Sequence, residues 1–165
     1  SYIYGRQGQL DQALQAINSC LNVSPRDPVA HTRRGQIMEK MGRLNEAAES
    51  YRAALRQSAN SGYLNTRLGI ISEQNGQPKM AEKYYARAYR AEQPNPEGTL
   101  LYANTLIRRG RHKRAIPALE KAIRLMPQNP MPRELLAQCY NELGKHGLAQ
   151  KMQAEAEILK KESPR

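Results

Sequence analysis

The sequence predicts an all-α fold in which antiparallel helix pairs stack side by side into a solenoid. Residues of the same kind recur every 34 positions across almost the whole chain. Within each period, apolar residues recur at spacings of three and four, which is the periodicity of one helix face. The 165 residues include no Trp and no Phe. The core must therefore rest on Leu, Ile, Ala, Met and the nine Tyr, and its richness in Ala favours closely packed helices.

Four columns of residues carry this period. A glycine recurs 34 residues apart at Gly8, Gly42, Gly76, Gly110 and Gly144. Later small residues form two columns: Ala13, Ala47, Ala81, Ala115 and Ala149, then Cys20, Ala54, Ala88, Ala122 and Ala156. An earlier small residue recurs at Gly35, Gly69, Ala103 and Ala137. Columns that stay in register without an insertion indicate a structural repeat.

Each period predicts two helices of about a dozen residues joined by a turn at the column glycine. The third full period shows both apolar faces, with Leu100, Ala103, Leu106 and Ile107, then Ile116, Leu119 and Ile123. Glycine allows the positive φ that commonly ends a helix. Clusters such as "QPNPEG" and "MPQNPMP" separate one period from the next. One helix pair cannot bury its apolar face alone, so neighbouring pairs must stack.

The 34-residue period with the pattern G-x4-A-x6-A resembles the tetratricopeptide repeat family. The resemblance implies a right-handed superhelix that forms a single domain over residues 1–165. It divides the chain into a partial repeat, 1–27, and four full repeats, 28–61, 62–95, 96–129 and 130–163. The family's large aromatic residue in the second helix is matched by Tyr51 and Tyr85. Leu119 is a tolerable substitute at that position, and Gln153 is not.

The two ends of the chain differ. In the last helix, 145–162, Gln150, Gln153 and Glu157 replace residues that are mostly apolar in earlier repeats. We therefore expect this helix to be a solvating cap. The start shows no such cap, and the register places Ser1 within a helix, so we expect a fragment of a longer chain. The two cysteines, Cys20 and Cys139, lack metal-type spacing and are expected to be buried.

No set of residues indicates catalysis. His112 and His146 occupy the same repeat position just after the turn glycine, so they form no chelating pair. The glycines follow the repeat and never form a phosphate-binding loop. The sequence therefore predicts a protein that is not an enzyme and that holds no cofactor and no metal.

The resemblance implies that the first helices of the repeats line a concave groove that binds a partner protein or peptide. The candidate partner-binding residues are Tyr2, Arg33, Gln36, Lys40, Tyr63, Arg67, Ile70, Gln74, Leu101, Asn104, Arg108, Gln138 and Asn141. Their amides suit the backbone of an extended segment, and Arg33 and Arg67 are expected to stack in neighbouring repeats. The family's Lys–Asn clamp for a terminal carboxylate is absent, because its lysine position holds Thr32, Thr66, Leu100 and Glu134.

The net charge of +11 favours anionic partners. Repeat 96–129 has seven basic residues against Glu97 and Glu120, a net +5. Within it, the turn "IRRGRHKRAI" is a possible anion patch, formed by Arg109, Arg111, Lys113 and Arg114. Lys113 and Arg114 are expected to begin a helix, where positive charge is unfavourable.

Three functions follow from these features. The first is a protein-interaction scaffold that binds an extended or helical segment. The second is binding of RNA, DNA or an acidic polysaccharide, although stacking aromatic residues are not interleaved with the basic ones. The third, which only the resemblance to bacterial tetratricopeptide repeat proteins implies, is an assembly factor of a bacterial envelope or pilus machine. No run is long and apolar enough to enter a membrane. The partner, the oligomeric state and the compartment, cytoplasmic or bacterial periplasmic and envelope-associated, stay open.

Overall fold

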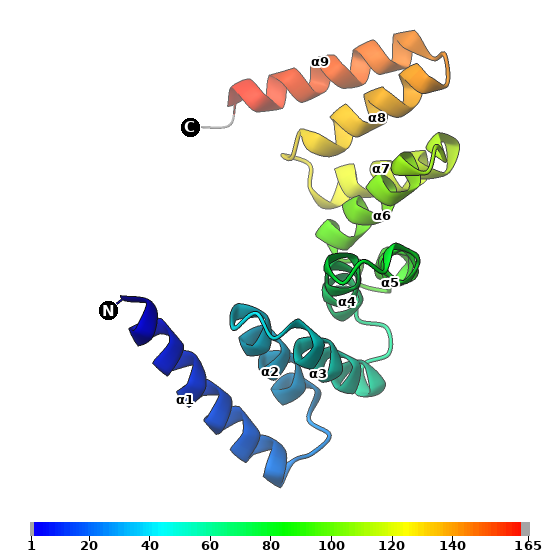
Figure 1. The fold of residues 1–165 in the computed structure, drawn as a ribbon. Coiled ribbons are helices and arrows are strands. Elements are labelled where there is room, and N and C mark those ends of the chain that lie inside the picture. Colours follow the sequence, from blue (N-terminus) through cyan, green and yellow to red (C-terminus); the bar gives the residue numbers. More distant parts are fainter. Residues whose placement is uncertain (1, 163–165) are drawn as a thin grey trace.

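The computed structural model describes residues 2–162, and the side chains of residues 8–162. Within these residues, the chain forms nine helices and no β-strand, which confirms the all-α solenoid (Figure 1). The helices are α1 (Tyr2–Val23), α2 (Pro28–Lys40), α3 (Leu44–Gln57), α4 (Gly62–Gln74), α5 (Pro78–Arg90), α6 (Pro96–Arg108), α7 (His112–Leu125), α8 (Met131–Glu142) and α9 (His146–Glu162).

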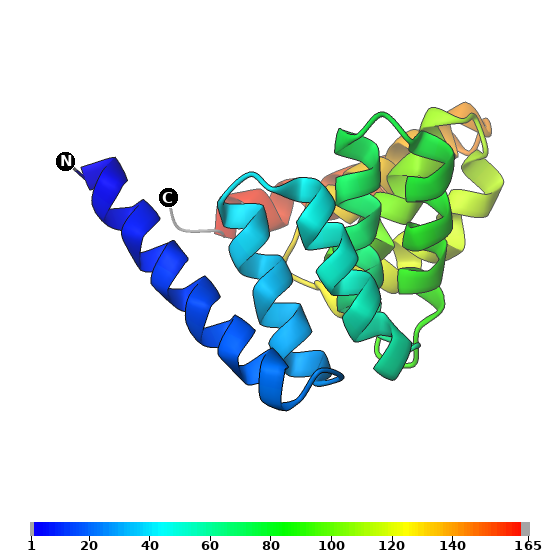
Figure 2. The ribbon, with the colours of Figure 1, turned by 60° about the horizontal axis from the view of Figure 1, so that its bottom comes forward.

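After α1, the helices form four hairpins that stack into an arc. Figure 1 shows the arc, with both ends of the chain on its open side, and Figure 2 shows the hairpins stacked in sequence order. Helix α4 contacts α6, and α6 contacts α8. Since first helices of successive hairpins touch each other, they lie on the inner side of the arc. The concave face is therefore formed by α2, α4, α6 and α8.

Local sequence signals set the helix ends. The turn glycines Gly42, Gly76, Gly110 and Gly144 all have positive φ, between 67° and 74°. At the start of the first helices, the side chains of Asp27, Ser61 and Asn95 accept hydrogen bonds from backbone N–H groups of α2, α4 and α6. These acceptors satisfy amides that have no partner within the helix.

The first repeat departs from the pattern expected from its sequence. Helix α1 runs unbroken from Tyr2 to Val23, so Gly8 lies inside the helix and forms no turn. The column residues of α1 are less buried than their equivalents in the later helices. Ala13 is half-buried and Cys20 is exposed. The expectation of two buried cysteines is therefore wrong for Cys20, whereas Cys139 is buried.

The core consists of the small columns packed around a few large side chains. The eight alanines of the two columns that follow the turn glycine, from Ala47 to Ala156, are at most 2% exposed. The ring of Tyr51 fills the space above Gly35, where an added Cβ would lie 2.5 Å from the ring carbon Cε1. The Tyr51 hydroxyl donates a hydrogen bond to Glu39 at the end of α2. The same arrangement recurs one repeat later, in Gly69, Tyr85 and Glu73.

The next repeat replaces all three members of this set together. Leu119 stands in place of the tyrosine, Ala103 in place of the glycine and Ile107 in place of the glutamate. All three are buried. Without an aromatic ring, a methyl group fits between the helices, and without a hydroxyl, no acceptor is needed. The packing at these positions is therefore polar and aromatic in the first two hairpins and wholly aliphatic in the third.

The last helix is largely exposed on its outer side. Gln150 and Gln153 are exposed, and Ala149 and Ala156 are the buried residues of α9. Among the described helices, none combines the length and the apolar character that a membrane crossing requires.

We predict that Gly69→Ala destabilises the fold by about 1–3 kcal/mol, because the new methyl group overlaps the Tyr85 ring. In the Tyr85→Leu background the same substitution should cost almost nothing, since Ala103 and Leu119 pack well in the next repeat. Urea unfolding followed by far-UV circular dichroism measures both, as a double-mutant cycle. Gly147→Ala is the control, because Gly147 lies in α9 with open space around it. Equal costs in the two backgrounds would show that the ring does not exclude the methyl group.

Candidate functional site

The concave face has a hollow between α1 and α2, which we call the α1–α2 slot. Its volume is about 560 Å³. Helix α2 contributes residues spaced three and four apart, so the slot follows two turns of that helix. The lining residues are Ala13, Ala16 and Ile17 from α1, and Arg33, Gln36, Ile37 and Lys40 from α2.

Two further hollows continue from the slot. One of about 340 Å³ lies on the other side of α2 and shares Arg33 and Gln36 with the slot. The other, of about 730 Å³, lies between the loops that precede α4 and α6. These two share Ser58, Ser61 and Tyr63. The three hollows therefore form one groove from α1 across α2 to the start of α4.

The groove brings together four of the candidate residues, Arg33, Gln36, Lys40 and Tyr63. The Gln36 side-chain amide donates a 2.8 Å hydrogen bond to the Tyr63 hydroxyl, which joins α2 to α4 across the groove. Tyr63 is 37% exposed, so its ring remains open to a ligand.

The other candidates lie elsewhere. Ile70 and Leu101 pack partly against the core. Asn104 is half-buried, and Gln74, Gln138 and Asn141 are exposed. The side chain of Tyr2 lies outside the described residues. Of the candidate partner-binding residues, only those on α2 and Tyr63 on α4 therefore line the groove.

Arg67 is held by an ion pair inside the protein. Its guanidinium donates to both carboxylate oxygens of Glu39, from Nε to Oε2 at 3.0 Å and from Nη2 to Oε1 at 2.5 Å. The same carboxylate accepts the Tyr51 hydroxyl. Glu39 holds the pKa of Arg67 above its ordinary value, and burial together with Glu39 raises the pKa of Tyr51. Arg67 therefore links two repeats instead of stacking with Arg33 as a free cation.

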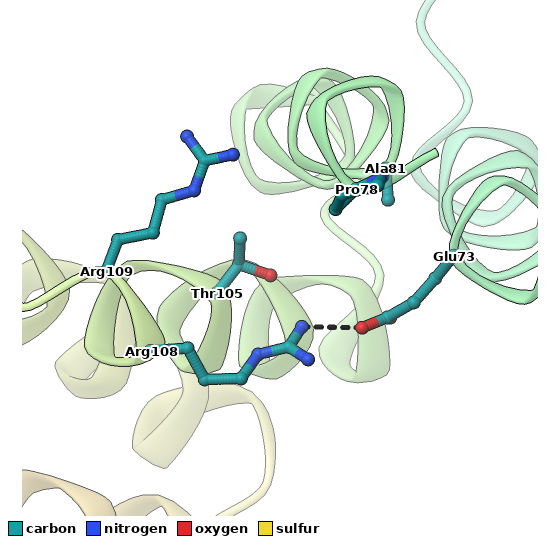
Figure 3. A pocket seen from close by; sticks show the side chains of 6 residues that line it. All are labelled: Glu73, Pro78, Ala81, Thr105, Arg108 and Arg109. Carbon is teal, nitrogen blue, oxygen red and sulfur yellow. Dashed lines mark hydrogen bonds and ion pairs between the residues drawn. The ribbon is translucent and has the colours of Figure 1, made fainter. Parts of the chain in front are cut away.

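Arg108 is engaged in a similar way. Its Nη2 lies 2.5 Å from Glu73 Oε1, beside a small hollow of about 200 Å³ (Figure 3). Tyr85 donates a 2.9 Å hydrogen bond to the other oxygen of Glu73. The Arg108 guanidinium and the Tyr85 hydroxyl lower the pKa of the Glu73 carboxyl.

Arg33 and Lys40 differ from these two arginines. Neither takes part in any ion pair among the described residues, and both are exposed. They stand seven residues apart on α2, two helical turns or about 10.5 Å along its axis. The slot therefore has an unpaired positive charge towards each end and apolar side chains between them.

Half of the possible anion patch is neutralised from a neighbouring helix. Arg109 and Arg111 both pair with Glu82 of α5. Lys113 and Arg114 are exposed in the first turn of α7, and no ion pair of the described chain involves them. The sequence pattern missed Glu82 because it lies in the preceding repeat. Only the repeat register, which brings the start of α5 beside the next turn, could have indicated it.

The described residues hold no group of three or more His, Cys, Asp or Glu side chains that could bind a metal ion. Burial raises the pKa of the Cys139 thiol to about 11. A buried thiol that stays protonated at neutral pH is a poor nucleophile. Cys139 therefore has a packing role.

Comparison with family models identifies the same repeat. Residues 2–62 match the model described as tetratricopeptide repeat. Residues 74–152 match the model of anaphase-promoting complex, cyclosome, subunit 3. No curated protein matches the sequence significantly.

Solved structures show the same fold. A crystal structure of MamA superposes with a TM-score of 0.77 at 20% identity, covering 94% of this chain and 91% of that one. MamA from Desulfovibrio magneticus RS-1 gives 0.73 at 18% identity, covering 97% and 90%. YrrB, described as a TPR protein with an unusual peptide-binding site, gives 0.72 at 19% identity, covering 98% and 83%. At such identities the likeness concerns the fold.

We predict that Glu73→Gln destabilises the protein at neutral pH by roughly 1 kcal/mol or less, because Arg108 is largely exposed. The folded-state pKa of Glu73 lies below its ordinary value of 4.5, so the unfolded chain binds more protons between these two values. Stability therefore rises with pH there. The difference between wild type and variant should be complete above about pH 4.5 and vanish as pH falls through the lowered pKa.

Urea unfolding at several pH values measures this difference. Glu92→Gln serves as the control, because Glu92 is exposed and no ion pair of the described residues includes it. A stability difference that stays constant into acid would exclude an electrostatic role for Glu73.

Proposed function

Because the chain belongs to the tetratricopeptide repeat family, we propose that it is a protein-interaction scaffold that binds a partner segment in the groove along α1, α2 and α4. Both family models support a scaffold of this kind. The absence of catalytic activity stays a prediction.

The observation that carries this proposal is the groove of three adjoining hollows on the concave face. Its apolar floor, from residues such as Ile17 and Ile37, can cover apolar side chains of a partner. Arg33 and Lys40 can pair with carboxylates, and the exposed Tyr63 ring offers a further contact. The partner segment best suited to this surface combines apolar side chains with acidic ones.

We predict that Arg33→Glu with Lys40→Glu weakens binding at least about tenfold, or 1.4 kcal/mol, because two attractive charges become repulsive. Peptides selected from a displayed random library against the immobilised wild-type chain provide the ligands. Fluorescence anisotropy then compares their affinities for wild type and variant. Lys40 and Arg33 carry no internal ion pair, so the variant should remain folded by circular dichroism.

The matched control is Arg52→Glu with Arg90→Glu, which makes the same change of charge at exposed positions of α3 and α5. Its affinities should stay within about twofold of wild type, since net charge alone acts weakly at physiological ionic strength. Equal loss of affinity in the two double variants would remove the groove as the binding site.

Binding of a polyanion is the second candidate, and the exposed charges of Lys113 and Arg114 favour it. The pairing of Arg109 and Arg111 with Glu82 weakens it. If the protein binds polyanions, its affinity for a single-stranded oligonucleotide should fall steeply as the salt concentration rises. The double variant Lys113→Glu with Arg114→Glu should bind the oligonucleotide more weakly than wild type at the same salt concentration. A role in a bacterial envelope or pilus assembly stays an untested alternative.

A further inference from the structure

We propose that the convex side of the arc docks on an anionic lipid bilayer, with α5 at the centre of the contact. The groove for a partner protein lies on the opposite, concave side, so the proposal concerns a second surface and goes beyond the proposed function. It assigns a role to positive charge that neither the ion pairs nor the groove use.

Helix α5 carries a stripe of exposed basic side chains. They are Lys79, Lys83, Arg87 and Arg90. Spacings of three and four residues place them on one side of the helix. None of them takes part in an ion pair among the described residues. The acidic residue of α5, Glu82, pairs instead with Arg109 and Arg111 of the next turn. The stripe is therefore uncompensated positive charge.

The second helices of the neighbouring hairpins extend this charge to both sides. The repeat register places Lys113 of α7 beside Lys79, and it places Arg56 of α3 and Arg124 of α7 beside Arg90. All three flanking residues are exposed and have no ion pair in the described chain. The exposed acidic residues of α3 and α7 are Glu49 and Glu120. We call the stripe together with its three flanking residues the convex basic face.

Helix stability accounts for only part of this charge. Arg56, Arg90 and Arg124 lie in the last turns of their helices, where positive charge suits the helix dipole. Lys79 and Lys113 lie in the first turns of α5 and α7, where positive charge is unfavourable and no acidic residue offsets it. Charge that costs local stability and has no partner inside the described chain indicates a partner outside it.

The position of this face in the solenoid keeps it open. The first helices contact one another on the inner side of the arc, so α3, α5 and α7 form the outer side (Figure 1). The hairpins stack on one another in sequence order from α1 to α9. Further repeats at either end would extend the arc and leave its outer side uncovered. The exposure of the convex basic face therefore does not depend on where the sequence begins or ends.

The chemistry of the face does not suit a single-stranded nucleic acid. Proteins that bind single strands stack the bases on aromatic rings. The rings of α5 are covered: Arg87 lies over Tyr84, Tyr85 is buried, and Tyr89 stacks on Tyr102. A double helix is itself convex, so it would meet the convex side along a short line only.

The face suits an anionic bilayer better than a protein. Protein interfaces depend on apolar and aromatic anchors at their centre, and Met80 is the exposed large apolar residue of α3, α5 and α7. A bilayer needs no such cluster, because each Lys or Arg near an anionic surface strengthens binding about fivefold by charge alone. Met80 is 43% exposed beside Lys79 and Lys83, so its side chain can reach the headgroup layer. The groove then faces away from the bilayer and stays free for a partner protein.

Vesicle sedimentation tests the proposal. The probes are vesicles of phosphatidylcholine alone or with about one third phosphatidylglycerol. The chain should bind the anionic vesicles, should not bind the neutral ones, and should dissociate as the salt concentration rises. Lys79→Gln with Lys83→Gln should weaken binding at least about tenfold. The matched control is Lys145→Gln with Lys161→Gln, which removes the same charge from exposed positions outside the convex basic face and should weaken binding less than about threefold.

A tryptophan reporter locates the contact, because the chain contains no Trp. Met80→Trp places the ring on α5. Met131→Trp places it at the start of α8, a helix of the concave side, where Met131 is 51% exposed. With anionic vesicles, the emission of the first variant should shift to the blue and become shielded from acrylamide, since Trp favours the bilayer interface. The emission of the second variant should not change.

Competing polyanions separate a bilayer from other acidic partners. An oligonucleotide and poly-glutamate are each added at the charge concentration of the lipid headgroups. The chain should stay on the vesicles, because neither polymer offers a plane of charge or an interface for Met80. Release by the oligonucleotide would assign the face to nucleic acid, and release by poly-glutamate would assign it to an acidic protein. Either result overturns the inference.

Three further results would also overturn it. They are no binding to anionic vesicles, an equal loss of binding in the two lysine double variants, and a blue shift of the Met131→Trp variant that equals or exceeds that of Met80→Trp. Each of these results leaves peptide binding in the groove untouched, because the groove residues lie on α1, α2 and α4 and in the loops before α4 and α6.

Discussion

The structure depends on one packing constraint. In a hairpin whose second helix carries a buried tyrosine, the first helix must make room for the ring and accept its hydroxyl. The Tyr51 ring needs Gly35 beneath it, and its hydroxyl needs an acceptor because an unpaired buried hydroxyl is costly. Glu39 is that acceptor, and its charge in turn pairs with Arg67 of the next repeat. One packing requirement inside a hairpin thus leads to the polar contact between hairpins, and the resulting chain of contacts spans α2, α3 and α4.

These contacts also determine which charged side chains remain free to contact a partner. The carboxylates of Glu39 and Glu73 lie on the concave helices, but tyrosine and arginine side chains satisfy both. Arg33 and Lys40 have no such carboxylate partner among the described residues, so their charges remain exposed in the groove.

Much of the fold follows from the sequence, because its signals are local and repeated. The column glycines predicted the turns at Gly42, Gly76, Gly110 and Gly144, and small columns predicted the close packing of the helices. Gly8 carries the same signal but lies inside α1, which runs unbroken from Tyr2 to Val23, so the glycine column alone did not predict every turn correctly. Pairings such as Glu82 with Arg109 and Arg111 have no local signal, so the candidate site was predicted only in part.

The change from Tyr85 and Glu73 to Leu119 and Ile107 divides the solenoid into two kinds of interior. In α2–α5, polar and charged contacts hold the hairpins, and such contacts weaken with acid and, where exposed, with salt. In α6 and α7 the equivalent contacts are aliphatic, and salts that favour burial of apolar surface strengthen them. The contacts inside the α2–α3 and α4–α5 hairpins are therefore more sensitive to acid than the equivalent contacts between α6 and α7, although both belong to one repeat pattern.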